Sequence, residues 1–333
     1  MSVVLTRSRA LNALRAYWSY ALSRLGSVRF LTPYTLHHTP LFVSVEPAAV
    51  CQLRCPACPV GLRNTGKPGC RDTERCMSFE VWHRVLSEIR DTAFIVQFYF
   101  QGEPLLNKDL PQMIREAHDA GLYTIVSTNA QAMTEAMAEA LVNSGLDRII
   151  VSMDGLTEES YNAYRVGGSL EKCKEALRYL RDSKSRHLGI SRPPIIELQC
   201  LRLKSNEHEW AQFKREYKAL GADRLVFKTA QLYDYANGHP LMPSQERYSR
   251  YIKGEDGLYH RRSLRKGCWR VWSGVVVTTN GEVLPCCYDK NHAYAYGNIM
   301  DAPLKELFAN ERAMAFRKTA FQQFPKICQE CWK

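Results

Sequence analysis

The sequence contains no apolar run close to the ~18 residues that a membrane-spanning helix requires. It also has no uninterrupted apolar stretch near its start of the kind that forms a secretory signal. These absences argue against membrane-spanning and secreted proteins, so a cytoplasmic location is expected. The net charge of +11 does not predict a nucleic-acid partner, because the basic residues form no stripe interleaved with aromatic residues.

Acidic residues are absent from positions 1–45, although arginine occurs there repeatedly, at Arg7, Arg9, Arg15, Arg24 and Arg29. Apolar residues recur in the same segment at helical spacing, namely Leu11, Leu14, Trp18, Leu22 and Leu25. We therefore predict a basic amphipathic extension over residues 1–40. Its apolar stripe fits a helix that packs on the main domain, or one that contacts a membrane surface or a partner. An organelle transit peptide would have a similar composition.

Strand and helix patterns alternate over residues 41–235. Predicted strands cover Phe42–Val45, Phe94–Phe100, Leu122–Val126, Arg148–Val151, Ile195–Leu203 and Arg224–Phe227. Amphipathic helices are predicted over Met77–Ile89, Leu110–Ala120, Met133–Asn143, Leu170–Ser183 and Glu207–Leu220. The alternation predicts an α/β domain with a parallel sheet. A (β/α) barrel, or part of one, and a doubly wound sheet both fit, but no G-x-G-x-x-G follows the first strand.

Residues 236–265 are interpreted as a connecting segment, and a small unit follows over residues 266–333. Two short strands flank Asn280-Gly281, which is a strong hairpin turn signal. A helix is predicted over Pro303–Thr319. The C-terminal unit is thus expected to be a hairpin followed by a helix.

Twelve cysteines without a secretion signal indicate reduced, metal-binding thiols rather than a disulfide framework. Cys51, Cys55 and Cys58 form a C-x-x-x-C-x-x-C directly after the first strand. Three thiolates at this spacing bind one face of a cubane iron–sulfur cluster and leave one iron open. The alternative is a zinc site completed by Cys70 or Cys76.

With this cysteine loop after its first strand, the sequence resembles the radical SAM superfamily. The resemblance implies a partial (β/α)6 TIM-like barrel and a [4Fe–4S] cluster whose open iron binds S-adenosylmethionine. It implies reductive cleavage of S-adenosylmethionine to a 5′-deoxyadenosyl radical, which abstracts a hydrogen atom from the substrate. A reductant such as flavodoxin or ferredoxin is then expected.

Further segments resemble the cofactor-binding motifs of this family. Gln101-Gly102-Glu103-Pro104 follows the second strand, where the family has a Gly-Gly-Glu-Pro segment, and Gln101 replaces the first glycine. Polar residues also follow the third and fourth strands. The resemblance assigns cofactor binding to Gly102, Glu103, Asn129, Ser152, Asp154 and Arg165. Those at strand ends share the carboxyl edge of the sheet, where barrel active sites are built.

A second cysteine set, Cys268, Cys286, Cys328 and Cys331, resembles the SPASM and twitch extensions of the same superfamily. Four thiolates close an auxiliary [4Fe–4S] cluster completely. Cys287 is a spare, either an alternative ligand or a buried thiol. A structural zinc site is the competing interpretation.

The function expected from these motifs is a net two-electron oxidation or modification of a substrate. A peptide or protein and a small molecule, such as a sugar or aminocyclitol alcohol, both remain candidates, because fold and cofactor do not decide between them. A non-catalytic iron–sulfur electron carrier or sensor is the alternative from another class. It would lack the set of Glu103, Asn129, Ser152 and Arg165, which this sequence has.

Overall fold

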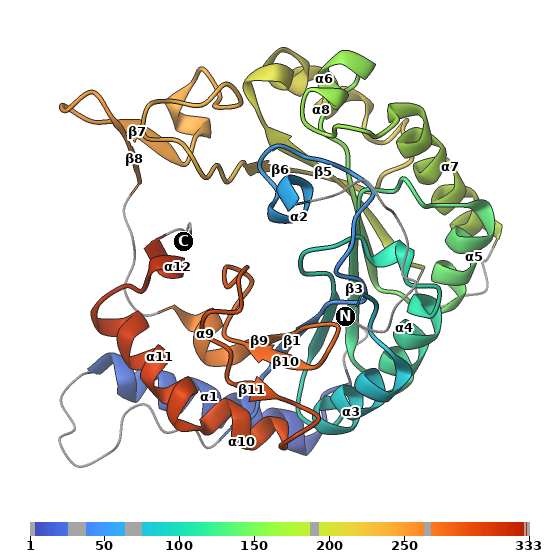
Figure 1. Cartoon of the computed structure of the whole chain (residues 1–333). Helices are drawn as coiled ribbons and strands as arrows, with labels where there is room; N and C mark the ends of the chain where they lie inside the picture. The colour runs from blue at the N-terminus through green and yellow to red at the C-terminus, as the bar shows by residue number, and fades with distance from the viewer. Residues whose placement is uncertain are drawn as a thin grey trace.

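The computed structural model describes residues 4–25, 38–63, 75–186, 193–262, 268–329 and 331. In this part of the chain, nine strands form one curved sheet in the order β11-β10-β9-β1-β2-β3-β4-β5-β6, and β7 pairs with β8. Strands β1 to β6 are parallel to their neighbours, and β9 is parallel to β1. Figure 1 shows helices along the outer side of this arc and α2 on its inner side.

The strands have the following bounds: β1 Phe42–Val45, β2 Ile95–Phe98, β3 Tyr123–Thr128, β4 Arg148–Ser152, β5 Ile195–Arg202, β6 Arg224–Thr229, β7 Tyr251–Lys253, β8 Tyr259–Arg261, β9 Gly274–Val277, β10 Glu282–Leu284 and β11 Gly297–Asn298. All six strands predicted in the main domain are therefore present. The connecting segment is less irregular than expected, because it contains the β7–β8 hairpin.

The α-helices have the following bounds: α1 Arg7–Leu25, α2 Pro59–Arg63, α3 Phe79–Ile89, α4 Leu110–Asp119, α5 Glu135–Asn143, α6 Glu158–Asn162, α7 Leu170–Arg186, α8 Trp210–Glu216, α9 Trp269–Ser273, α10 Leu304–Ala309, α11 Glu311–Gln322 and α12 Lys326–Gln329. Short 3-10 helices cover Pro104–Leu106, Lys204–Glu209 and Glu246–Tyr248. The single helix predicted over Pro303–Thr319 is two helices, because extended backbone at Asn310 ends α10 and its side chain caps α11.

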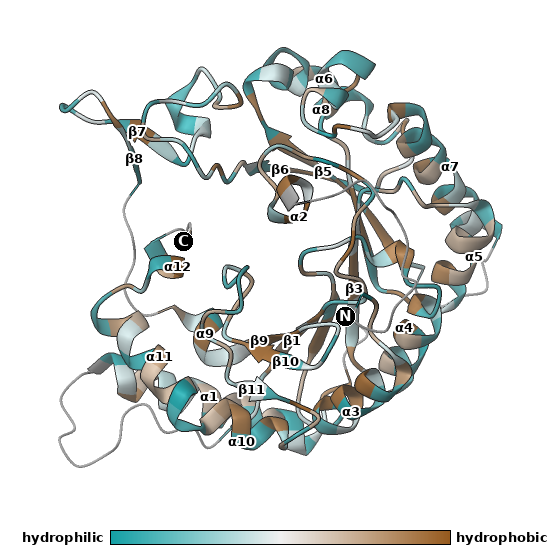
Figure 2. Cartoon of the chain, in the orientation of Figure 1, coloured by the Kyte–Doolittle hydropathy of each residue, from teal (hydrophilic) through white to brown (hydrophobic). Residues whose placement is uncertain are grey.

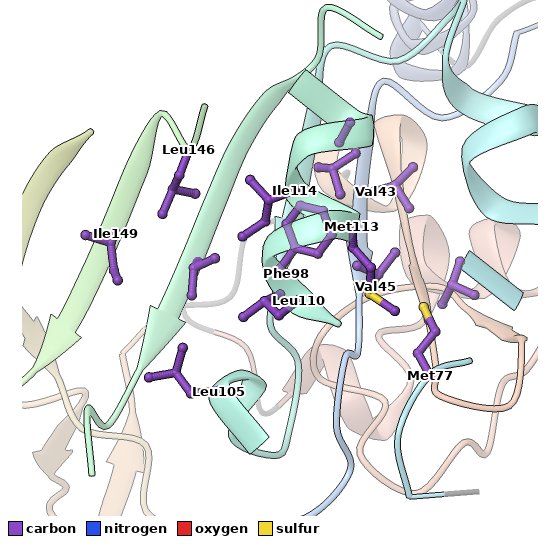
Figure 3. Packing of buried hydrophobic residues seen from close by; sticks show 14 of the residues in the cluster. Val43, Val45, Met77, Phe98, Leu105, Leu110, Met113, Ile114, Leu146 and Ile149 are labelled. Atoms are coloured by element: carbon purple, nitrogen blue, oxygen red, sulfur yellow. The ribbon is translucent and has the colours of Figure 1, made fainter. Parts of the chain in front are cut away.

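The main core lies between the sheet and the outer helices. Alternate strand residues such as Val43, Phe98 and Ile149 belong to this layer, in which Phe98 lies beside Met113 and Ile114 of α4 (Figure 3). The strands are correspondingly apolar, whereas the outer faces of the helices carry more hydrophilic residues (Figure 2). The intervening strand residues face the opposite side of the sheet, which is the interior of the barrel.

Helix α1 differs from the interpretation in which its apolar stripe packs on the main domain. Leu11, Leu14 and Trp18 are 43%, 65% and 67% exposed. Arg9 and Asn12 are buried instead, so the polar side of the helix faces the protein. Among the helices that the structure describes, none is long and apolar enough to span a bilayer.

The C-terminal hairpin continues the main sheet, because β9 pairs with β1 from Phe42 opposite Gly274 to Val45 opposite Val277. Glu46 follows β1 at this seam and is 2% exposed. The backbone N–H groups of Thr279 and Gln101 and the charges of His292 and Lys290 face its carboxyl group. Burial outweighs these contacts and raises the pKa of Glu46 from 4.5 to about 7.

We predict that Glu46→Gln changes stability in a pH-dependent way. Because the pKa is higher in the folded chain, the contribution of protonated Glu46 is complete below pH 4.5 and is lost as the pH rises through about 7. Above that pH the wild type carries a buried carboxylate, so the variant should be more stable by up to about 3 kcal/mol. Near pH 5 the difference should be small.

Denaturant unfolding of the wild type and the variant near pH 5 and at a pH above 7 measures this difference in stability. Glu306→Gln is the matched control, because Glu306 is exposed on α10. A gain in stability for Glu46→Gln that is the same at both pH values would contradict the prediction.

Candidate iron–sulfur sites and barrel interior

The cysteine loop is held against the carboxyl edge of the sheet by close backbone contact with Gly102. A Cβ atom at position 102 would lie 2.0 Å from the Ala48 carbonyl oxygen and 2.7 Å from the backbone nitrogen of Val50. The next residue, Glu103, donates its backbone N–H to the Val50 carbonyl at 2.8 Å. Only glycine therefore fits at position 102. The backbone that Gly102 approaches is that of Ala48 and Val50, which lead into the cysteine loop.

The thiols of Cys51, Cys55 and Cys58 lie near one another: in addition to burial, Cys55 and Cys58 help to raise the pKa of Cys51, and Cys58 helps to raise that of Cys55. Burial raises the pKa of Cys51 to about 12 and that of Cys55 to about 11. The Leu53 backbone N–H donates to Cys51 Sγ at 3.4 Å. Thiolates at these positions need positive charge beside them, and the iron of a bound cluster provides it.

Glu103 is buried and tightly held. Its carboxylate accepts hydrogen bonds from Thr128 Oγ1 at 2.5 Å, the Asn129 backbone N–H at 2.8 Å and the Leu105 backbone N–H at 3.1 Å. A carboxylate accepts about four hydrogen bonds, so capacity for one further donor remains. Burial raises the pKa of Glu103 despite these donors.

Asp154 and Arg165 form a buried ion pair, with Arg165 Nε 2.6 Å from Asp154 Oδ2. The other oxygen of Asp154 accepts the backbone N–H of Leu201 at 2.6 Å. The Arg165 side chain also donates to Cys55. Asp154 is 0% exposed, so its carboxylate contacts Arg165 and the Leu201 backbone and is closed to solvent.

Asn129 and Ser152 occupy the ends of β3 and β4. The Asn129 side chain donates to Cys51 Sγ at 3.3 Å, and its oxygen accepts from Gln52 Nε2 at 3.2 Å. Ser152 is the last residue of β4 and lies opposite Gln199 of β5. The structure thus brings all six expected cofactor residues to the same edge of the sheet as the cysteine loop.

The zinc interpretation finds little support in these donors. Cys76 is disulfide-bonded, so its thiol does not complete a site with Cys51, Cys55 and Cys58. This bond also departs from the expectation of reduced thiols. Cys70 lies outside the described residues. Within the described ranges, no three His, Cys, Asp or Glu side chains lie close enough to share one metal ion.

The C-terminal cysteines converge from three elements. Cys268 precedes α9, Cys286 follows β10, and Cys328 lies in α12. Cys286 and Cys328 each interact electrostatically with Cys268, and Cys328 also does so with Cys331. Burial raises the pKa of Cys328 to about 12. This donor set fits a closed iron–sulfur cluster for the same electrostatic reason as the first set.

The barrel interior contains a charged cluster that the sequence analysis missed. Arg148 of β4 pairs with Glu197 of β5 at 3.5 Å, and Arg270 of α9 donates to Gln97 Oε1 at 2.9 Å. Lys228 of β6 interacts with both arginines and with Glu197. We call Arg148, Glu197, Lys228 and Arg270 the interior charge cluster. The sequence contained a signal for it: strand residues alternate between the two faces of a sheet, so charged residues that alternate with apolar core residues point to the interior.

Cys287 lies between the auxiliary cysteines and the interior charge cluster. It influences Cys286 on one side and both Tyr99 and Lys228 on the other. Burial raises the pKa of Tyr99, while Arg270 and Arg148 oppose this shift. Cys287, the spare cysteine, therefore lies close to both the auxiliary cysteines and the interior charge cluster.

Comparison with known proteins agrees with this geometry. Residues 45–195 match the radical SAM superfamily, and residues 268–332 match SPASM, an iron–sulfur cluster-binding domain. A PqqA peptide cyclase from Rhodopseudomonas palustris is 28% identical over 322 residues, covering 88% of this chain and 79% of the relative. One from Granulibacter bethesdensis is 25% identical over 317 residues, with the same coverage.

Solved structures show the same fold. The Streptococcus suis protein SuiB bound to S-adenosylmethionine has a TM-score of 0.63 at 14% identity, covering 88% of this chain and 72% of SuiB. The protein anSMEcpe with bound AdoMet has a TM-score of 0.62 at 20% identity, covering 85% and 81%. The α/β fold with a parallel sheet core is thus confirmed.

The enzyme therefore binds a [4Fe–4S] cluster with S-adenosylmethionine and an auxiliary iron–sulfur cluster. With both cysteine sets placed and both domains matched, the chain belongs to the radical SAM superfamily and has a SPASM domain after its barrel.

Proposed function

We propose that this enzyme modifies a peptide by a net two-electron oxidation. The observation that carries the proposal is the position of the cysteine loop, which opens toward a barrel interior containing charged side chains. Lys228 in this interior is exposed. The relatives named PqqA peptide cyclase match most of the chain, and SuiB has been solved with its precursor peptide SuiA. Both support a peptide rather than a small molecule as substrate.

The chain's own residues have distinct roles in this proposal. Cys51, Cys55 and Cys58 hold the first cluster, and Cys268, Cys286, Cys328 and Cys331 hold the auxiliary one. Gly102, Glu103, Asn129, Ser152 and Arg165 bind S-adenosylmethionine, and Asp154 orients Arg165. When bound, the first cluster and S-adenosylmethionine would supply reductive cleavage and hydrogen-atom abstraction, and the auxiliary cluster would supply an acceptor for one electron. A flavodoxin or ferredoxin is the proposed reductant.

The interior charge cluster positions the substrate. Three cationic side chains, Arg148, Lys228 and Arg270, share it with a single carboxylate, Glu197. The surplus positive charge favours a substrate segment that offers carboxylate or carbonyl oxygens. The Lys228 side chain is accessible to solvent, but desolvation by the surrounding barrel still lowers its pKa. Glu197 opposes this shift, and Arg148 and Arg270 add to it.

We predict that replacing Cys51, Cys55 and Cys58 together by alanine abolishes S-adenosylmethionine cleavage. Anaerobically reconstituted, dithionite-reduced wild type should form 5′-deoxyadenosine, which chromatography measures. Cys173→Ala is the matched control, because Cys173 is a buried core thiol and should leave cleavage intact. Persistent cleavage in the triple variant would refute the assignment of these ligands.

We predict that Lys228→Met reduces peptide modification about tenfold or more, since a lost hydrogen bond to a charged group costs ~1.5–3 kcal/mol. Cleavage of S-adenosylmethionine without peptide should be unchanged. The assay incubates the enzyme with a candidate precursor peptide and follows loss of the mass of two hydrogen atoms from that peptide. Lys253→Met, exposed on β7, is the control; equal effects of both variants would argue against a substrate contact.

We predict that Cys328→Ala/Cys331→Ala retains 5′-deoxyadenosine formation but loses peptide oxidation, because the variant lacks the electron acceptor. Iron analysis of wild type should give about eight irons per chain, as expected for two cubanes. A value of about four irons with one zinc would show that the C-terminal site is structural. Unchanged peptide oxidation in the variant would also exclude the acceptor role.

A further inference from the structure

Helix α1 exposes its apolar side and buries its polar side. Arg9 and Asn12 are 1% and 5% exposed, whereas Leu14, Tyr17 and Trp18 are each at least 65% exposed. A helix that merely covers a core has the opposite arrangement. The exposed apolar face therefore needs its own explanation.

Directional hydrogen bonds fix this orientation. Arg9 Nη2 donates to the Arg90 and Ala120 carbonyls, both at 2.7 Å, and Nη1 donates to the Gly121 carbonyl at 2.9 Å. The Asn12 side chain donates to the Thr92 carbonyl at 3.0 Å. These carbonyls lie at the ends of α3 and α4, so Arg9 and Asn12 anchor the first half of α1. Tyr20, in its second half, packs edge-on against Trp269, Trp272 and Phe321.

The outward face is a continuous apolar ridge. Leu11, Leu14 and Trp18 follow at intervals of three and four residues, so they lie on one side of the helix. Leu5, just before the helix, is also 71% exposed. Exposed apolar side chains that gather in one patch mark an interaction surface, whereas scattered ones do not.

The charges around the ridge identify the class of partner. Arg7 and Arg15 are exposed on the same helix, and residues 1–45 contain no Asp or Glu. The partner is therefore anionic. A convex ridge needs either a matching groove or a surface that deforms around it. A lipid interface can deform in this way. Trp and Tyr side chains favour the depth of lipid headgroups, where arginine meets phosphate.

We propose that α1 docks this enzyme on the surface of a bilayer that contains anionic phospholipid. The helix lies in the plane of the interface, with Leu11, Leu14 and Trp18 inserted among the acyl chains and Arg7 and Arg15 at the phosphates. The barrel remains in water. This docking does not depend on the substrate proposed above.

The test is co-sedimentation of the full, cluster-loaded chain with vesicles. One set is phosphatidylcholine alone, and the other also contains phosphatidylglycerol. The wild type should bind the anionic vesicles, and added salt should weaken binding. Leu14→Ser/Trp18→Ser should reduce binding by at least about tenfold, and Arg7→Gln/Arg15→Gln should remove the preference for anionic lipid.

Ile252→Ser/Leu258→Ser is the matched control, because it removes two exposed apolar side chains from the β7–β8 hairpin. It should bind like the wild type, and every variant should form 5′-deoxyadenosine at the wild-type rate. Absence of wild-type binding to anionic vesicles would overturn the proposal. So would a wild-type dimer that Leu14→Ser/Trp18→Ser dissociates without any vesicle binding, since the ridge would then join two copies.

Discussion

The buried ion pair between Arg165 and Asp154 is the interaction on which the site depends. Asp154 follows β4 and accepts a backbone N–H at the end of β5, while Arg165 reaches the thiol of Cys55. The Arg54 backbone N–H donates to the Val166 carbonyl at 2.9 Å, which fixes the cysteine loop beside Arg165. Loss of either charge would leave the other unpaired in a buried place, which is strongly destabilising. The sheet and the loop are therefore held in register by one pair.

The seam between the barrel and the SPASM domain imposes a second constraint. Because β9 pairs with β1, the auxiliary cysteines are positioned by the same sheet that carries the cysteine loop. Gln101 replaces the expected first glycine of its motif and donates its side chain to the Lys290 carbonyl at 2.9 Å. The departure from the family pattern is thus explained by a contact between the two domains.

The sequence predicted the strands, most helices and both cysteine sets because each has a strong local signal. It did not predict which side of α1 is buried. Periodicity identifies two faces of a helix, but the carbonyl contacts of Arg9 decide between them, and three of these come from residues far away in the chain, namely Arg90, Ala120 and Gly121. The interior charge cluster was missed for a related reason. Arg148 and Lys228 resemble ordinary surface charges until the barrel curvature brings their strands together.

Two features of the molecule run against the rule that apolar residues lie inside and charges lie outside. The barrel interior contains Arg148, Glu197, Lys228 and Arg270, and α1 presents Leu14 and Trp18 to the outside. Neither arrangement adds stability to the isolated chain, because the buried carboxylate of Glu197 and the partly buried arginines lose hydration, and exposed apolar groups gain nothing from the core. Natural sequences break local consistency mainly where function requires it. Both features are therefore the basis of the two binding proposals: a polar substrate segment inside the barrel, and an anionic lipid surface at α1.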